Sequence, residues 1–472
     1  MEQPAGREQK KTGQRTQIDI EVESVSGKRL LILGIAWPAL AESVLSSLVS
    51  MVDMIMVGSM GAWAIGAVGL VTQPRFVMIA AFMALNVGST AMVSRFKGAG
   101  DKNNANLVLR QSIIMAAGIS LLLCIAMFFG GESLIRFLAG ANISENMIQG
   151  ANTYLRIQVY GFPTLALTFT VNAVLRGVGN TKAAFYNNGV ANIVNVFFNY
   201  CLIGGNLGFP ELGITGAAIA TVIAQCAAFG MALSKVLTGR EFVRIEIKKI
   251  FQVDFSIIRR ILKIGIPAMI EQLIMRVGNM LYTIIVTSLG DHSYAAHMIT
   301  MNLQQFSFMT GMSFGAAATT LVGQSLGRNR PDLSRLYVKM THKLNFIFAA
   351  IVALVFFFFG EFITQLYTQD HELALLAANV LKIIALVTPF NSARLVYTSA
   401  LRGAGDSRFT AVITFVGILL IRPIFSVFLV FPPFPFQLGL LGIWMAFSSD
   451  GIVCFFLAQR RFKQGKWANI KV

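Results

Sequence analysis

The sequence predicts an all-α membrane protein whose twelve transmembrane helices form two parallel, pseudo-symmetric six-helix lobes. The composition, the spacing of apolar stretches and an internal repeat lead to this fold class. The chain has 472 residues, of which 55% are hydrophobic and only 13% are charged. A soluble fold of this size could not cover its surface with so few charged side chains.

Apolar stretches long enough to cross a bilayer, roughly 20 residues each, recur along almost the whole chain. We expect spans at about 31–57, 62–92, 107–130, 150–175, 183–204, 213–237, 260–288, 291–325, 336–359, 374–401, 408–430 and 439–459. Several exceed the bilayer minimum, which predicts tilted helices. Residues 1–29 are polar and carry no apolar run, so we expect them to form a cytoplasmic tail.

Lysine and arginine are concentrated in alternate loops. They gather before the first span, after every second span and after the last, whereas the opposite loops hold only Arg136. By the positive-inside rule, both termini should be cytoplasmic. The net charge of +17 is then a topology signal, and no nucleic acid partner is expected.

The two halves repeat each other. A shift of 229 places Pro38 on Pro267 and Glu42 on Glu271, and a shift of 226 places residues 175–181 (LRGVGNT) on residues 401–407 (LRGAGDS). We therefore expect a first lobe at 30–237, a cytoplasmic linker at 238–259 and a second lobe at 260–472. Parallel six-helix repeats can rock about a central cavity and give alternating access.

These motifs resemble those of the multidrug and toxic-compound extrusion (MATE) family. Residues 52–58 (VDMIMVG) are similar to its VDxxxVG motif in the first helix, and the two LRG segments are similar to its repeated LRGxGDT signature. The resemblance covers about residues 28–465. It implies a secondary active antiporter that exports organic, often cationic, compounds and is driven by inward H⁺ or Na⁺. Together with the loop charges, the resemblance favours a bacterial plasma membrane.

The resemblance assigns cation coupling to Asp53. In the expected fifth span, Asn192, Asn195 and Asn199 recur at spacings of 3 and 4, which places them on one helix face. Their carbonyl oxygens could complete a cation site, with Na⁺ at Asp53, Asn195 and Asn199; the alternative is that they pack helices. Some relatives carry an acid where this chain has Asn199, and its loss favours H⁺ over Na⁺.

Other polar residues within spans are candidates for the substrate cavity. Intramembrane charges are expensive and need a partner or a function. The candidates are Glu42, Glu271, Arg276, Arg394 and His297, and further intramembrane charges are Arg75, Arg156, Lys382, Arg422 and Asp450. One interpretation pairs Arg276 with Glu271 and Arg422 with Asp450. The other is a basic pocket for an anionic substrate group.

Two other functions compete with transport of organic cations. A membrane enzyme is disfavoured because the chain has no HExxH, GxSxG or Walker A motif. A flippase or exporter of an anionic or lipid-linked substrate remains the alternative, since the intramembrane arginines would suit it. We expect a monomer among membrane lipids, with a small organic substrate, no cofactor beyond the coupling ion, and no metal other than the possible Na⁺.

The coupling chemistry does not repeat between the halves. The shifts that align the motifs place Asp53 on Tyr282 and Asn195 on Ile421. The sequence therefore predicts that the first lobe couples to the ion.

Overall fold

The computed structural model describes residues 24–139, 143–239, 241–246, 249, 252–430 and 438–470. Most of the expected tail, residues 1–23, lies outside the described residues. The first half consists of α1 (Val25–Gly58), α2 (Ala62–Gly98), α3 (Lys102–Ala139), α4 (Glu145–Gly177), α5 (Thr181–Ile203), η1 (Asn206–Gly208) and α6 (Gly213–Leu237). The second consists of α7 (Phe255–Thr287), α8 (Asp291–Gly327), α9 (Pro331–Gln365), α10 (His371–Gly403), α11 (Ser407–Phe415), η3 (Val416–Ile421), α12 (Arg422–Val430), α13 (Gly439–Lys463) and η4 (Lys466–Asn469).

The described residues contain twelve long helical segments, because α11, η3 and α12 follow one another without a break. The predicted fold class is therefore confirmed. Nine of these segments are apolar enough over 18 residues to count as membrane spans by composition. The other three are α4, α5 and α8, which turn polar side chains toward the protein interior; Gln158, Thr170 and Asn172 of α4 are all buried.

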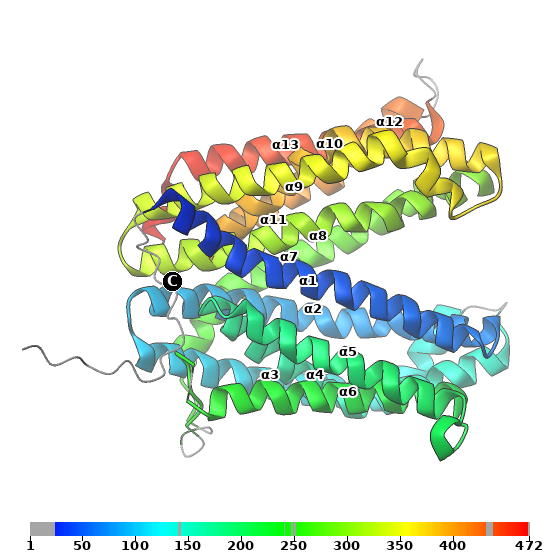
Figure 1. The fold of residues 1–472 in the computed structure, drawn as a ribbon, viewed down its shortest axis with the longest axis horizontal. Coiled ribbons are helices and arrows are strands. Elements are labelled where there is room, and N and C mark those ends of the chain that lie inside the picture. Colours follow the sequence, from blue (N-terminus) through cyan, green and yellow to red (C-terminus); the bar gives the residue numbers. More distant parts are fainter. Residues whose placement is uncertain are drawn as a thin grey trace, which may run out of the picture.

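The helices form two lobes, and at one end the first helix of each lobe packs against the other lobe. Figure 1 shows α2–α6 in its lower part and α8–α13 in its upper part, with α1 crossing in front. Ile32 and Ile35, near the start of α1, belong to the apolar core of the second lobe. Ile257 and Ile261, near the start of α7, belong to the core of the first. Each lobe thus holds the beginning of the other lobe's first helix.

Two glycines related by the repeat allow α2 and α8 to approach closely. A Cβ atom added to Gly98 would collide with the backbone of Gln324, and one added to Gly327 would collide with the carbonyl oxygen of Arg95. Three side-chain hydrogen bonds join the lobes nearby in the described part of the chain. Thr320 donates to the carbonyl oxygen of Arg176 (2.9 Å). The other two run from Gln324 to Gly177 O (3.1 Å) and from Arg95 to Ile470 O (2.8 Å).

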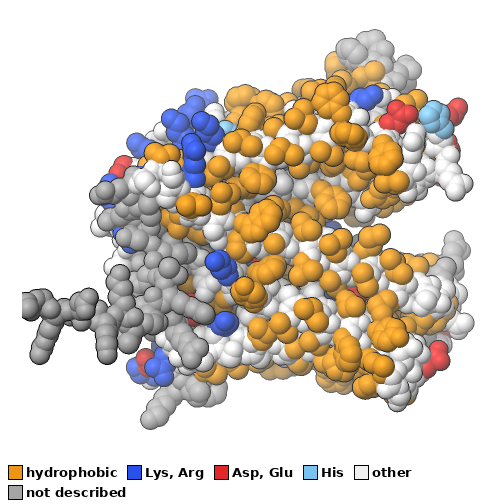
Figure 2. Space-filling view, viewed as in Figure 1, with side chains coloured by type: hydrophobic (Ala, Val, Ile, Leu, Met, Phe, Trp, Pro, Cys, Tyr) orange, Lys and Arg blue, Asp and Glu red, His pale blue; other side chains and the backbone are white. Residues whose placement is uncertain are grey.

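The Lys and Arg side chains gather at this same end of the molecule, which we call the basic end (Figure 2). The end of α13 and the start of α1 also lie there (Figure 1). At the opposite end, Figure 2 shows a cleft between the two lobes. The lobes are therefore closed at the basic end and open at the other.

The segment between the lobes packs on the first one. Between the end of α6 and the start of α7, the backbone N–H of Arg244 donates to Asn106 of α3 (2.7 Å). Gln111 of α3 donates to the carbonyl oxygen of Gln252 (2.8 Å). As far as it is described, this segment runs along the basic end.

Candidate ion and substrate sites

Asp53 of α1 meets two amides of α5. Asn199 donates a hydrogen bond of 2.8 Å to Asp53 Oδ1. With its nitrogen turned toward the carboxylate, Asn195 donates to both Asp53 oxygens at 2.9 Å. The hydroxyl of Thr221 in α6 lies 3.5 Å from the side-chain amide of Asn195. The spacing of four residues puts both amides on one face of α5, and three elements thereby build one polar cluster, which we call the first-lobe site.

The first-lobe site can respond to a proton. The Asn195 amide contacts an ionised carboxylate through its N–H₂ group, which donates two hydrogen bonds. With its carbonyl oxygen turned there instead, the same 2.9 Å contact requires a protonated Asp53, because an ionised carboxylate has nothing to donate. The oxygens of both side chains would also suit a monovalent cation. Arg75 interacts electrostatically with Asp53.

The third amide of the predicted stripe lies apart from this cluster. Asn192 is half-buried, and its amide nitrogen has no hydrogen-bond partner among the described residues. The structure therefore brings Asn195 and Asn199 to Asp53, while the cation-coupling role of all four residues stays a prediction.

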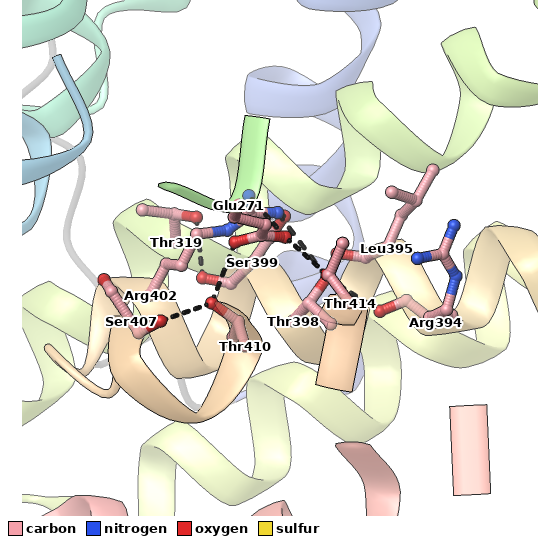
Figure 3. A network of polar contacts seen from close by, with 10 residues as sticks. All are labelled: Glu271, Thr319, Arg394, Leu395, Thr398, Ser399, Arg402, Ser407, Thr410 and Thr414. Carbon is pink, nitrogen blue, oxygen red and sulfur yellow. Dashed lines mark hydrogen bonds and ion pairs between the residues drawn. The ribbon is translucent and has the colours of Figure 1, made fainter. Parts of the chain in front are cut away.

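Glu42 and Glu271 each bind the arginine of an LRG segment. Glu42 pairs with Arg176 at 3.2 Å and accepts a hydrogen bond from Asn188 of α5. In the second lobe, Glu271 pairs with Arg402 at 3.5 Å. It also accepts from Thr410 (2.9 Å) and Thr414 (3.2 Å), as Figure 3 shows. Arg176 aligns with Arg402, and Asn188 with Thr414, by the same shift of 226. We call these two pairs the clamps.

The turn after each clamp arginine explains why its glycines recur. Gly179 and Gly405 have φ angles of +93° and +91°, a conformation that glycine adopts without steric cost. The turn lets α5 and α11 start beside α4 and α10 and so face the glutamates of α1 and α7. Sequence reasoning named the glutamates and left open a basic partner. Each half of the sequence contains both the glutamate and the LRG arginine, and this shared recurrence was the signal that could have identified the pairs.

The interpretation that pairs Arg276 with Glu271 is wrong, because Arg402 takes that place. The Arg276 guanidinium instead lies 3.0 Å from the ring centre of Phe76 in α2, across the interface between the lobes. The Arg276 side chain therefore faces the first lobe, while Glu271 is paired within the second lobe. The predicted pair of Arg422 with Asp450 is present, and both side chains are buried. On the outer surface, Arg156 pairs with Glu132 at 3.3 Å.

Arg394 and His297 are buried in the second lobe. Arg394 is 7% exposed, and its Nε atom has no hydrogen-bond partner among the described residues; in Figure 3 it lies apart from the Glu271 clamp. His297 is 2% exposed and packs against Tyr282 and Trp444, with ring centres 5.4 Å away in each case. The geometry brings neither residue into a cluster with Glu271 or Arg276.

No group of three or more His, Cys, Asp or Glu side chains that could hold a metal ion occurs within the described ranges. The four cysteines are free.

Comparisons with known proteins agree with this architecture. The family model MatE matches residues 38–201 and 267–428. A Thermotoga maritima protein named "Probable multidrug resistance protein NorM" is 29% identical over 446 residues, which is 94% of each chain. The Yersinia enterocolitica "Multidrug resistance protein MdtK" is 26% identical over 385 residues, 81% of this chain and 84% of that one.

Solved structures show the same fold. One is titled "Outward-facing conformation of a multidrug resistance MATE family transporter of the MOP superfamily"; it has a TM-score of 0.84 at 20% identity and covers 93% of this chain and 96% of its own. Another, from Pyrococcus furiosus, is titled "Reverse polarity of binding pocket suggests different function of a MOP superfamily transporter", with the same TM-score, identity and coverage. Because the MatE model matches well over half of the sequence, the chain belongs to the MATE family of multi-pass membrane transporters.

Proposed function

We propose that the protein is a secondary active antiporter that exports organic compounds by alternating access, coupled to inward movement of H⁺ or Na⁺. One observation carries the proposal: Asp53 lies in α1 with two amides of α5 at 2.8 and 2.9 Å. A carboxylate held this way can exchange a proton or a cation. Exchanging either would change the charge of the site and the hydrogen bonds that join α1 to α5.

The basic end is the cytoplasmic end in this proposal, by the positive-inside rule. The cleft in Figure 2 then opens away from the cytoplasm, which is the state that releases an exported substrate. The relatives compared above are bacterial, so we propose the plasma membrane of a bacterium. We also propose a monomer surrounded by lipid, with no catalysed reaction and no cofactor beyond the coupling ion.

We propose drug-like organic compounds as substrates, because the relatives compared above are named as multidrug resistance proteins, and we prefer cations among them because the coupling ion is itself a cation. A proton or Na⁺ that enters could then be exchanged for a cation that leaves. Glu42 and Glu271 would serve as acidic groups near the central cavity only when their clamps open, since both are now paired.

An anionic or lipid-linked substrate is the second candidate, and the arginines favour it. Arg276 contacts only an aromatic ring of the facing lobe among its described interactions, and Arg394 is a buried guanidinium with an unpartnered Nε. Charged groups of this kind bind carboxylate or phosphate readily.

Transport by purified protein in proteoliposomes tests both candidates. The experiment imposes either an H⁺ or a Na⁺ gradient and supplies a cationic dye or an organic anion. We expect one of the two ion gradients to drive the cationic dye in the direction opposite to the ion. We expect no transport of the organic anion. If a panel of organic cations fails under both gradients while an anion or a lipid-linked sugar is transported, the second candidate replaces the first.

A further inference from the structure

The second lobe contains a structural counterpart of the first-lobe site, shifted by one residue from the counterpart that the sequence repeat indicates. The repeat places Asn195 on Ile421 and Asn199 on Phe425. In the structure, however, Phe425 is 45% exposed, whereas Arg422 and Ser426 are 4% and 0% exposed. The inward pair is therefore Arg422 and Ser426, again four residues apart.

The π-helical segment η3 explains the shift. It spans Val416–Ile421 and ends directly before Arg422. A π-bulge inserts one extra residue into a helix, so every later residue occupies the face that its predecessor would otherwise have had. α5 has no such segment. Asn195 therefore corresponds in space to Arg422, and Asn199 to Ser426, which corrects the expectation that Asn195 matches Ile421.

The remaining members of the first-lobe site have counterparts around Arg422. Asp53 corresponds to Tyr282, and Thr221 to Phe447. The Arg422 guanidinium lies 5.3 Å from the Tyr282 ring centre and 4.2 Å from that of Phe447. Where the first lobe offers a carboxylate, amides and a hydroxyl, the second lobe therefore offers two rings and a positive charge.

Arg422 brings its own counter-charge. Its Nε donates to Asp450 of α13, and its Nη1 donates to Asn279 of α7 at 3.2 Å. The side chains of Arg422 and Asp450 are 5% and 3% exposed. The repeat mate of Asp450 is Ala224, so the acid and the arginine are both additions relative to the first lobe. Together they give this part of the second lobe a balanced charge without any bound ion.

We propose that the Arg422 guanidinium is a built-in cation: it occupies the second-lobe counterpart of the ion site and keeps that lobe in the equivalent of the ion-loaded state. A latent site for H⁺ or a small monovalent cation lies beneath it, at Asp450, Asn279 and Ser426. The hydroxyl of Ser426 is buried without a hydrogen-bond partner in the described structure and is available as a ligand. This inference rests on the proposed function in taking the Asp53 cluster as the ion site.

The physical reason is the cost of a buried charge. If Arg422 lost its charge, Asp450 would be a buried carboxylate that had lost the cation paired with it, which is strongly unfavourable. It would then bind a proton or a cation. Among the described residues, the other titratable or charged groups around this pair are Tyr282 and Glu271 of α7, His297 of α8, which packs on Tyr282, Arg394 of α10 and Cys454 of α13.

Thermal unfolding of purified variants tests the proposal without a substrate. The background is Asp53→Asn, which removes the carboxylate of the first-lobe site. We expect Arg422→Gln in this background to gain cation dependence: the unfolding midpoint should rise by about 2 °C or more between roughly 1 and 100 mM Na⁺, at constant ionic strength, or on acidification. The matched control Arg422→Lys, which keeps the charge, should show no gain.

Adding Asp450→Asn to the Arg422→Gln variant should abolish the gain, since the latent site would lose its carboxylate. If these two variants respond identically to Na⁺ and to pH, the proposal is wrong. The control variant Asp53→Asn alone carries no substitution in the second lobe, so misfolding of that lobe cannot affect its result. Its unfolding midpoint should show no Na⁺-specific increase. Persistent Na⁺ dependence there would mean that the native second lobe already binds an ion, which also overturns the proposal. All comparisons are made within the Asp53→Asn background, so they stand even if Asp53 proves not to couple transport.

Discussion

The two lobes share a clamp and differ at their centres. In each lobe, a glutamate four residues after the helix proline pairs with an LRG arginine. Farther along the same helices, the first lobe has Asp53 hydrogen-bonded to Asn199, and the second has Tyr282 beside Arg422. The two lobes therefore share the residues that hold their helices together, and they differ in the residues able to exchange an ion.

The clamps themselves differ in burial. The side chains of Arg176 and Glu42 are 26% and 15% exposed, while those of Arg402 and Glu271 are 16% and 6% exposed. Water reaches the first-lobe clamp more easily, so breaking it costs less.

The largest effect on closure of the basic end is expected from filling the glycine contact between the lobes. Gly98→Val or Gly327→Val would push α2 and α8 apart at the basic end, because each added side chain meets backbone atoms. Overpacking of this kind costs about 1–3 kcal/mol. We expect a roughly tenfold or greater loss of the state closed at the basic end, measured by spin-label distances across the lobes.

Gly118→Val is the matched control for this change, since nothing lies within 4 Å of a Cβ added there. The glycine account fails if Gly98→Val and Gly327→Val keep the distance distribution of the native protein.

The clamps provide the second comparison. Arg402→Ala leaves Glu271 buried with only two threonine donors, and we expect a loss of about 3 kcal/mol in the free energy of unfolding. Arg176→Ala should cost about 1 kcal/mol or less, because that pair is more exposed and screened by water. Denaturation of both variants in the same detergent gives the comparison. Equal losses would show that burial does not distinguish the clamps.

The sequence predicted the lobes well because the repeat is marked by prolines and glycines, whose positions depend on backbone geometry. It also predicted the pair of Arg422 with Asp450. It did not predict that Arg276 faces Phe76, because the direction of a side chain depends on how the lobes tilt. Nor could the sequence show that Arg422 occupies the position equivalent to Asn195. The π-helical segment leaves the alignment of the repeat ungapped, so the shift of one residue shows only in the burial pattern.

Asn199→Asp should sharpen the contrast by adding a second carboxylate to the first-lobe site. Asn199 already donates to Asp53 at 2.8 Å, so two acids would share one position and bind a cation to offset their repulsion. We expect Na⁺ affinity to rise about tenfold, equivalent to about 1.4 kcal/mol, in a titration calorimetry experiment. Asn192→Asp is the control and should change the affinity little. A larger gain at position 192 than at 199 would contradict the arrangement.

The smallest effect is expected at the hydrogen bonds between the lobes. Thr320→Val removes the hydrogen bond to Arg176 O and should shift the equilibrium toward opening at the basic end by about 1 kcal/mol. Its neighbour Thr319 donates to Ser399 O within the second lobe (2.8 Å). Thr319→Val should therefore lower the stability of the fold and leave the spin-label distances unchanged. If Thr319→Val changed the spin-label distances and Thr320→Val did not, Thr320 would have no role in the contact between the lobes.

The central claim is that the first lobe alone couples transport to an ion. Its most direct test compares Asp53→Asn with Tyr282→Phe, the same position in the other lobe, in proteoliposomes with an imposed pH or Na⁺ gradient. Tyr282→Phe loses only a hydrogen bond to Ile443 O (3.0 Å) and should keep gradient-driven transport. Asp53→Asn should fold and lose it. Native transport rates in folded Asp53→Asn would contradict the claim.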